Sequence, residues 1–214
     1  MELKGKKINF LGDSITEGHG TSDWATKPYH QLLKVNAGLA EARNYGKGGT
    51  KIARLPVITD NPFDQDFNLR ALDMDKDADM VVVFGGTNDY GHATIPLGSF
   101  DDSDIHTFYG GMHTLCKYLI ETYVDKPIVF MTPLHRLQEG KLDSEVSRPL
   151  KDFVNAQREV LEYYSIPVCD LFKDGGMPGN IWAWCEKYMP DGLHPNDAGH
   201  ELIAAKLQKF LENL

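Results

Sequence analysis

The stretch Ile8-Asn9-Phe10-Leu11-Gly12-Asp13-Ser14-Ile15-Thr16 changes from mainly apolar to polar at one point. The apolar residues up to Gly12 predict a buried first strand over residues 6–12. Ligands of open parallel sheets gather beyond the carboxyl ends of the strands, so we expect Ser14 at the mouth of a crevice. A serine there is a nucleophile if a base reaches it, or it merely caps the next helix. Gly-Asp-Ser alone favours the cap, so other residues must supply the base.

Length and composition describe an ordinary globular chain. The 214 residues suit a single domain, 1–214, with a sizeable core. A net charge of −9 argues against nucleic acid as a partner, since phosphate binding needs clustered Lys and Arg. No apolar run is long enough to span a bilayer, and residues 1–20 lack the apolar core of a signal peptide. Three cysteines without C-x-x-C spacing suggest neither a disulfide framework nor a metal site. The simplest expectation is a cytoplasmic protein.

Strand and helix patterns alternate along the chain. Strands are expected at residues 6–12, 42–50 (running into a glycine-dense turn), 80–84, 126–132 and 166–170. Helices are expected at residues 24–40, 104–123, 143–164 and 195–211, with a short one near 67–72 and loops at 90–103 and 171–193. Val146 and Leu150 are expected on the inner face of the helix at 143–164, and Pro195 in the first turn of the last helix. Five alternations argue for a parallel sheet with helices on both faces.

The turn before the last helix, Asp191-Gly192-Leu193-His194-Pro195-Asn196, supplies a candidate base. Asp191 and His194 are three residues apart, so the carboxylate can bind one imidazole nitrogen and leave the other to accept a proton from Ser14. The alternatives are a helix-start histidine without chemistry and an ordinary capping aspartate. For either residue alone, the two readings are about even.

Acyl chemistry also needs hydrogen-bond donors for a developing oxyanion. Three strand ends offer them: the N–H of Ser14, the N–H of Gly49 and the side-chain amide of Asn88. A plain sharp turn explains the glycines near Gly49 equally well, and Asn88 alone is more typical of a turn asparagine. Convergence of a nucleophile, a base and donors at the strand ends favours the catalytic interpretation.

Four segments, in this order, resemble those of the SGNH hydrolase family, also called GDSL esterases/lipases. They are Gly12-Asp13-Ser14-Ile15-Thr16-Glu17-Gly18, Asn44-x-Gly46-x-x-Gly49-Thr50, Gly86-Thr87-Asn88-Asp89 and Asp191-x-x-His194-Pro195-Asn196. The resemblance implies a flavodoxin-like, three-layer α/β/α sandwich with a five-stranded parallel sheet. It implies that Ser14 is the nucleophile, His194 the base and Asp191 its orienting group, with Ser14, Gly49 and Asn88 as the oxyanion hole. Gly48 is the alternative to Gly49, and the spacing from Asn44 favours Gly49. The resemblance implies neither a metal nor an organic cofactor.

Bulky or polar residues in the loops at the same sheet end are candidate walls of a substrate pocket. They are Tyr90, His92, His135, Trp182 and Trp184, with core packing as an equal alternative for the two tryptophans. None of these loops has a long aliphatic run, so we expect short acyl groups, acetyl above all, on a sugar or another small alcohol. Asp13 and Asp89 are expected to hold their turns by hydrogen bonds. His19, His30, His106, His113 and His200 are interpreted as surface or helix residues.

The leading hypothesis is a serine ester hydrolase that acts on a small-molecule ester through an acyl-enzyme. An acyltransferase would use the same residues with an alcohol in place of water, and a lysophospholipase or thioesterase would take longer acyl chains. A nucleotide-binding module is disfavoured, because neither G-x-G-x-x-G nor a P-loop follows the first strand. The sequence leaves the oligomeric state open, a homo-oligomer included.

Overall fold

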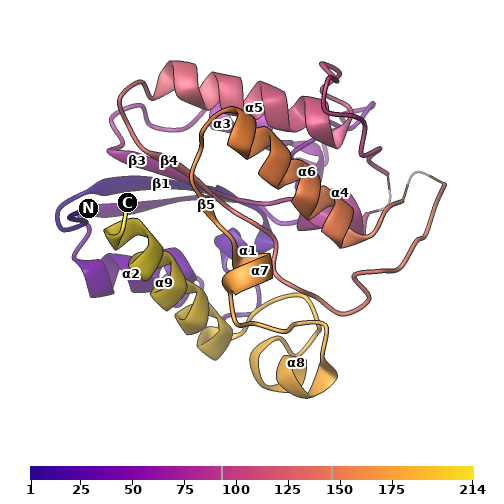
Figure 1. Ribbon diagram of the computed structural model, residues 1–214. Helices are drawn as coiled ribbons and strands as arrows, with labels where there is room; N and C mark the ends of the chain where they lie inside the picture. The colour runs from indigo at the N-terminus through magenta and orange to yellow at the C-terminus, as the bar shows by residue number, and fades with distance from the viewer. Residues whose placement is uncertain (93, 146) are drawn as a thin grey trace.

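Five strands form one parallel sheet in the part of the chain that the structure describes, residues 1–92, 94–145 and 147–214. The computed structural model places β1 (Lys7–Gly12) between β2 (Glu41–Gly46) and β3 (Met80–Phe84), with β4 (Ile128–Met131) and β5 (Val168–Cys169) beyond β3 (Figure 1). The chain therefore moves outward from β1 in one direction and then crosses to β3 on the other side. A crevice opens at such a switch point, beyond the carboxyl ends of the strands. The expected five-stranded parallel sheet is confirmed.

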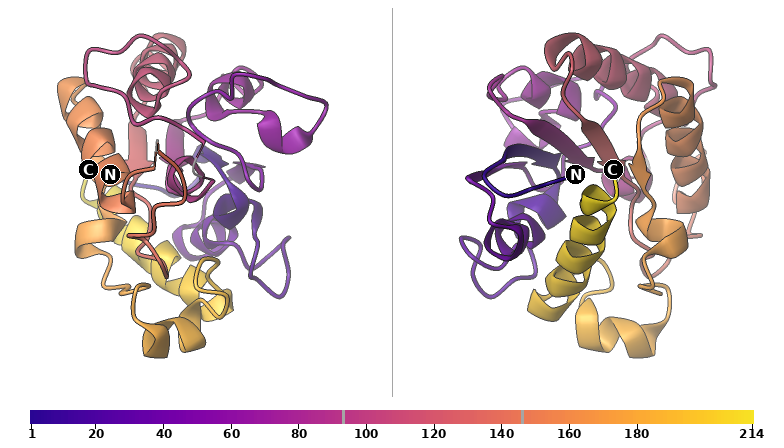
Figure 2. Two further views of the ribbon diagram at one scale, coloured as in Figure 1. Left: turned by 90° about the vertical axis from the view of Figure 1, so that its right-hand side faces the viewer. Right: turned by 60° about the vertical axis from the view of Figure 1, so that its left-hand side comes forward.

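Helices cover both faces of this sheet. On one face α2 (Tyr29–Ala37) packs against α9 (Asp197–Glu212), and on the other lie α3 (Phe67–Ala71), α5 (Phe108–Thr122) and α6 (Leu150–Tyr163) (Figures 1 and 2). The three-layer α/β/α arrangement expected from the sequence is thereby confirmed. None of the helices in the described residues combines the length and apolar character needed to cross a bilayer.

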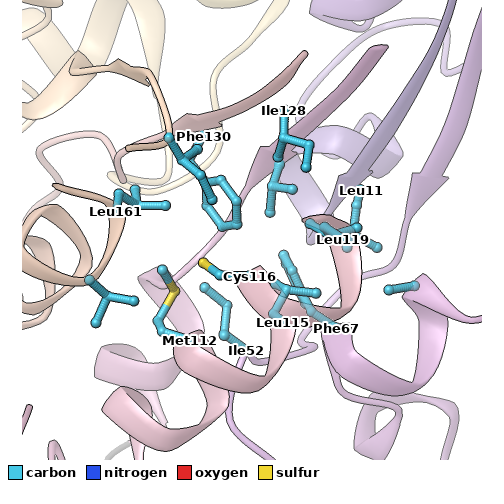
Figure 3. Close-up of a cluster of buried hydrophobic side chains, with 14 of the residues drawn as sticks. Leu11, Ile52, Phe67, Met112, Leu115, Cys116, Leu119, Ile128, Phe130 and Leu161 are labelled. Atoms are coloured by element: carbon cyan, nitrogen blue, oxygen red, sulfur yellow. The ribbon is translucent and has the colours of Figure 1, made fainter. Parts of the chain in front are cut away.

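Two apolar cores lie on the two faces of the sheet, because alternate residues of a strand point to opposite sides. Val81 and Val83 pack toward α5 and α6, whereas Val82 packs toward α2 and α9. Figure 3 shows the first core, in which Phe130 of the sheet lies near Cys116 of α5. The continuous apolar run of β3 thus serves both faces, as expected for a covered parallel strand.

Four helices begin later than their apolar patterns predict: prolines explain three of them, and the helix expected at 104–123 begins at Phe108, capped by Thr107. The expected helix at 24–40 begins at Tyr29, directly after Pro28, and the one at 143–164 begins at Leu150, directly after Pro149. A proline disfavours helical backbone in the residue before it, so the helix cannot extend back past it. Pro195 was expected inside the last helix, but it precedes the capping residue Asn196. Val146, expected on an inner helix face, lies outside the described residues.

Several short helices occupy segments that were expected to be loops. They are α4 (Thr87–Gly91), α7 (Leu171–Asp174) and α8 (Trp182–Tyr188), and α1 (Ser14–Glu17) fills the turn after β1. Helices this short are not stable by themselves, so packing against the rest of the protein decides whether they form. Two of them, α1 and α4, carry the candidate catalytic residues that follow β1 and β3.

Candidate active site

Ser14, His194 and Asp191 form a connected chain of side chains. The hydroxyl oxygen of Ser14 lies 3.0 Å from Nε2 of His194, and Nδ1 of the same imidazole lies 2.6 Å from Oδ2 of Asp191. The two segments are 180 residues apart in sequence, so only the fold joins them. With Nδ1 protonated toward Asp191, Nε2 is an acceptor for the Ser14 hydroxyl. This is the arrangement that activates a serine for nucleophilic attack.

The helix α1 presents Ser14 at the end of β1. Asp13 caps this helix through a 3.0 Å hydrogen bond from the Ile15 amide, which confirms its expected role in holding the turn. The helix also lies close against the end of β2, since a Cβ at Gly46 would be 2.2 Å from the amide nitrogen of Glu17. Only glycine allows that approach. The glycine-dense turn after β2 therefore serves in part to seat the helix that carries Ser14.

The loop before α9 fixes His194 through Asp191. Oδ1 of Asp191 accepts the amides of Leu193 and His194 at 2.9 and 2.7 Å, while Oδ2 faces the imidazole. Burial alone would raise the pKa of Asp191, but these hydrogen bonds outweigh it and hold the pKa below its usual value. A carboxylate that stays ionised can stabilise the imidazolium that forms when His194 takes a proton.

Two further groups near Ser14 have the chemistry of oxyanion donors. Gly49 adopts a φ of +70°, and among the described residues no protein acceptor is bound to its N–H. The neighbouring N–H of Gly48 is instead donated to the Glu17 carboxylate at 2.8 Å. Asn88 is buried, and its side-chain amide donates one hydrogen bond to the Thr50 carbonyl at 3.0 Å. That amide has a second N–H to offer.

Buried charges lie beneath the turns that carry these groups. Burial raises the pKa of Asp13 to about 7 and that of Asp89 to about 6, although amide hydrogen bonds lower both. Asp89 was expected to hold its own turn, but its carboxylate accepts the amides of Ile52 and Ala53 and so holds the segment after Gly49. Arg70 of α3 donates to the Gly12 carbonyl and the Thr50 hydroxyl at 2.9 and 2.8 Å, and to the Tyr45 carbonyl. Nothing in the sequence singled out Arg70.

A cavity of about 580 Å³ opens beside Ser14 and His194. Of the five candidate pocket residues, His92 lines it, and Tyr90, His135, Trp182 and Trp184 do not. The placement of these four is therefore a correction to the sequence interpretation. Other residues form the walls, among them Trp24, Phe63, Lys51, His19 and Leu193.

Helix geometry explains why His92 and Tyr90 differ. His92 follows Asn88 by four residues and so lies on the same side of the α4 turn, whereas Tyr90, two residues from each, points to the opposite side. Tyr90 is buried, its hydroxyl donates to the Gln138 carbonyl, and its ring packs on Phe153 and Arg136.

The other three excluded residues have partners elsewhere. His135 binds Glu139 at 2.9 Å and stacks on Phe172 with 3.8 Å between ring centroids. Trp182 is 56% exposed, and Trp184 stacks on Tyr188 within α8. The helix α8 lies away from the ends of β1 and β3 in Figure 1, which leaves its tryptophans outside the cavity.

Two aromatic walls of the cavity were missed because they lie in irregular segments. Trp24 was assigned to a helix, but it lies in the turns before Pro28 and is 48% exposed. Phe63, in the 3₁₀ turn Pro62–Asp64, is 53% exposed and packs over Gly49. A large aromatic residue within a Pro- and Asn-rich loop is the sequence signal that could have identified Phe63 as a cavity residue. His19, taken for a surface or helix residue, has its ring 4.8 Å from that of His194.

The described residues contain no cluster of three or more His, Cys, Asp or Glu side chains arranged to hold a metal ion. His30 in α2 and His200 in α9 are helix residues, as expected, and both are fully buried. Nδ1 of His200 accepts the Tyr29 amide at 3.0 Å, and burial lowers its pKa to about 4. A neutral imidazole committed to a backbone amide in this way is not a candidate base for Ser14.

Known proteins share both the sequence pattern and the fold. The profile of the GDSL-like lipase/acylhydrolase family matches residues 10–202. A structure of a protein from Lactobacillus plantarum is 32% identical, with a TM-score of 0.86 and coverage of 99% of this chain and 98% of that one. A lipase/acylhydrolase from Enterococcus faecalis is 24% identical, with a TM-score of 0.64 and coverage of 97% and 96%.

A salicylyl-acyltransferase from a tetracycline biosynthetic pathway shares the fold, at 18% identity and a TM-score of 0.67, over 98% of this chain and 55% of that one. None of the curated proteins compared with the chain matches it. The family match covers most of the sequence, in agreement with the fold, so this chain belongs to the GDSL-like lipase/acylhydrolase family and is a hydrolase of that type.

Proposed function

We propose that the protein is a serine carboxylic ester hydrolase that works through an acyl-enzyme. The observation that carries this proposal is the contact of the Ser14 hydroxyl with Nε2 of His194 at 3.0 Å, with Asp191 bound to the other imidazole nitrogen. Serine is a weak nucleophile without such a base. A capping role alone would not explain the contact with His194, because Asp13 already caps α1.

In the proposed mechanism, Ser14 Oγ attacks the ester carbonyl while His194 takes its proton. The N–H groups of Ser14 and Gly49 and the free amide N–H of Asn88 stabilise the oxyanion of the tetrahedral intermediate. His194 then gives the proton to the leaving alcohol, and the acyl group stays on Ser14. Water, deprotonated by His194, attacks the acyl-enzyme and releases the acid, which returns Ser14 to its starting state.

We further propose short acyl esters, acetyl above all, of sugars or other small alcohols as substrates. Among the described residues that line the cavity, Leu193 is the single aliphatic one, and the others are polar, aromatic or glycine. A long acyl chain gains about 0.8 kcal/mol for each methylene that it buries, which requires an extended apolar groove. A lysophospholipase or thioesterase is therefore the less favoured alternative.

An acyltransferase is the second candidate function, and the shared fold of the salicylyl-acyltransferase is what favours it. The same acyl-enzyme would then pass its acyl group to an alcohol instead of water. Product analysis with added sugar or alcohol acceptors separates the two, since a transferase yields a new ester.

The nucleophile can be tested by labelling with a serine-reactive fluorophosphonate. Wild type should be labelled once, at Ser14, and Ser14→Ala should lose both labelling and hydrolysis of p-nitrophenyl acetate while keeping its fold. His194→Ala should also abolish hydrolysis. His106→Ala is the control, because His106 is not among the described residues that line the cavity, and it should keep most activity. A label elsewhere, or equal losses in the two histidine variants, would contradict the assignment.

A series of p-nitrophenyl esters from acetate to decanoate tests the acyl preference. The value of kcat/KM should be highest at acetate and fall with chain length. An optimum at octanoate or beyond would overturn the short-chain proposal and leave the esterase proposal standing.

A further inference from the structure

Lys51 is a buried cation in the wall of the catalytic cavity. It is only 6% exposed, and it lines the same cavity as Ser14, Asn88 and His194. Among the described residues, its ammonium group has neither a hydrogen bond nor an ion pair within 4 Å. An ammonium group carries three N–H donors. The ammonium nitrogen is not one of the fully buried unpaired atoms of the described residues, so its donors face the open cavity, where they can meet an acceptor of a bound ligand.

Carboxylates near Lys51 compensate its charge but do not accept its hydrogen bonds. Asp89 and Asp64 both act on it electrostatically. Asp89 is occupied by the amides of Ile52 and Ala53, and Asp64 by the amide and hydroxyl of Thr59 at 3.0 and 2.6 Å. Glu17, which also lines the cavity, accepts the Gly48 amide. The free donors of Lys51 therefore remain for a ligand in the cavity.

Lys51 shares the cavity wall with the candidate oxyanion donors Gly49 and Asn88. It follows Gly49 by two residues, and it lies near His92, which is one turn along α4 from Asn88. The pKa of His92 is lowered, first by burial and then by the positive charges of Lys51 and Arg136. At neutral pH His92 is thus an uncharged neighbour that can donate one hydrogen bond and accept another.

We infer that Lys51 forms an anion-binding subsite and that the ester substrate carries a carboxylate, on its acyl or its alcohol part, which binds there. This inference rests on the proposed esterase function. A carboxylate supplies charged acceptors, and hydrogen bonds between charged groups are about twice as strong as neutral ones. A neutral ester of the same shape leaves the Lys51 donors to water and gains no such charge-assisted hydrogen bond.

Two pairs of esters, each a carboxylate and its carboxamide, test the subsite. Monomethyl succinate and methyl succinamate place the group on the acyl part, and 4-acetoxybenzoate and 4-acetoxybenzamide place it on the alcohol part. We expect wild type to prefer the carboxylate about tenfold in kcat/KM in one pair, mainly through a lower KM. The pair that shows the preference identifies the part of the ester that faces Lys51.

Lys51→Met keeps the length of the side chain and removes its charge, so it should lower that preference to near unity. Lys47→Met is the matched control, since Lys47 belongs to the same turn but is not among the described residues that line the cavity, and it should keep the preference. Fluorophosphonate labelling of Ser14 reports whether each variant retains its active site. If wild type hydrolyses these esters without a preference in either pair, or if Lys51→Met leaves the preference intact, the subsite is wrong and the esterase proposal stands. If wild type hydrolyses none of the four esters or p-nitrophenyl acetate, the esterase proposal itself fails.

Discussion

At the scale of single residues, Asn88 shows how a buried amide can hold a turn and still take part in chemistry. One of its N–H groups is used by the Thr50 carbonyl, which fixes the plane of the amide. The side chain is buried but lines the cavity, so its second N–H can meet a substrate oxygen. A donor held in this way needs no reorganisation when charge develops on that oxygen.

Asn88→Ala is expected to lower kcat of ester hydrolysis by about a hundred- to a thousandfold, or roughly 2.7–4 kcal/mol, because the oxyanion loses one donor. KM should change little, since the donor acts mainly on the transition state. Steady-state kinetics with p-nitrophenyl acetate measures both constants. A rise in KM with an unchanged kcat would instead make Asn88 a substrate-binding residue.

At the scale of elements, Arg70 connects three segments that local sequence cannot bring together. Its guanidinium, on α3, binds the Gly12 carbonyl at the end of β1, the Tyr45 carbonyl in β2 and the Thr50 hydroxyl beyond Gly49. Thr50 in turn accepts the Asn88 amide of α4. One side chain thus fixes the spacing among the segments that carry Ser14, Gly49 and Asn88.

Arg70→Met is expected to lower the free energy of unfolding by about 3 kcal/mol, because several buried acceptors lose a charged partner. It should also lower kcat more than it raises KM, since the oxyanion donors that shift act mainly on the transition state. Urea unfolding and steady-state kinetics measure the two effects. Arg148→Met, at an exposed arginine, is the control and should unfold like wild type. An unchanged unfolding midpoint for Arg70→Met would show that the turns are held by other contacts.

At the scale of the whole molecule, the buried Asp13 links stability to pH. Burial, the largest cause, raises its pKa in the folded protein to about 7, above the ordinary value of 3.8. Between these two values the unfolded chain releases the proton and the folded protein keeps it. Folding is therefore favoured by protonation, and this contribution is lost as the pH rises to about 7.

Asp13→Asn should remove this dependence and keep the cap on the Ile15 amide, because asparagine caps helices as well as aspartate does. The variant should match wild type near pH 4 and become relatively more stable up to about pH 7, by at most about 4 kcal/mol for a shift of this size. Urea unfolding of both proteins from pH 4 to pH 8 measures the difference. A difference that stays constant over this range would mean that Asp13 is already ionised in the folded protein at pH 4.

The sequence by itself determined the sheet and the residues at its carboxyl edge. The apolar runs of β1 and β3 end in Gly12 and Phe84, and polar segments follow at once, so strand positions and strand ends could be predicted from local pattern. Asp191 and His194 belong to one turn, and their 2.6 Å contact depends on a spacing of three residues. Such features can be predicted from the sequence because the residues that produce them lie close together in the chain.

Only the tertiary structure decided which side chains form the cavity and which short helices exist. The contact between Ser14 and His194 joins segments that only the fold brings together. Tyr90 lies outside the cavity because it is part of the helix α4, which directs its ring toward Phe153. Lys51 and Arg70 have no local pattern, because their roles depend on partners in other segments. Loop side chains take the direction that packing allows, and that packing is set by residues far away in the sequence.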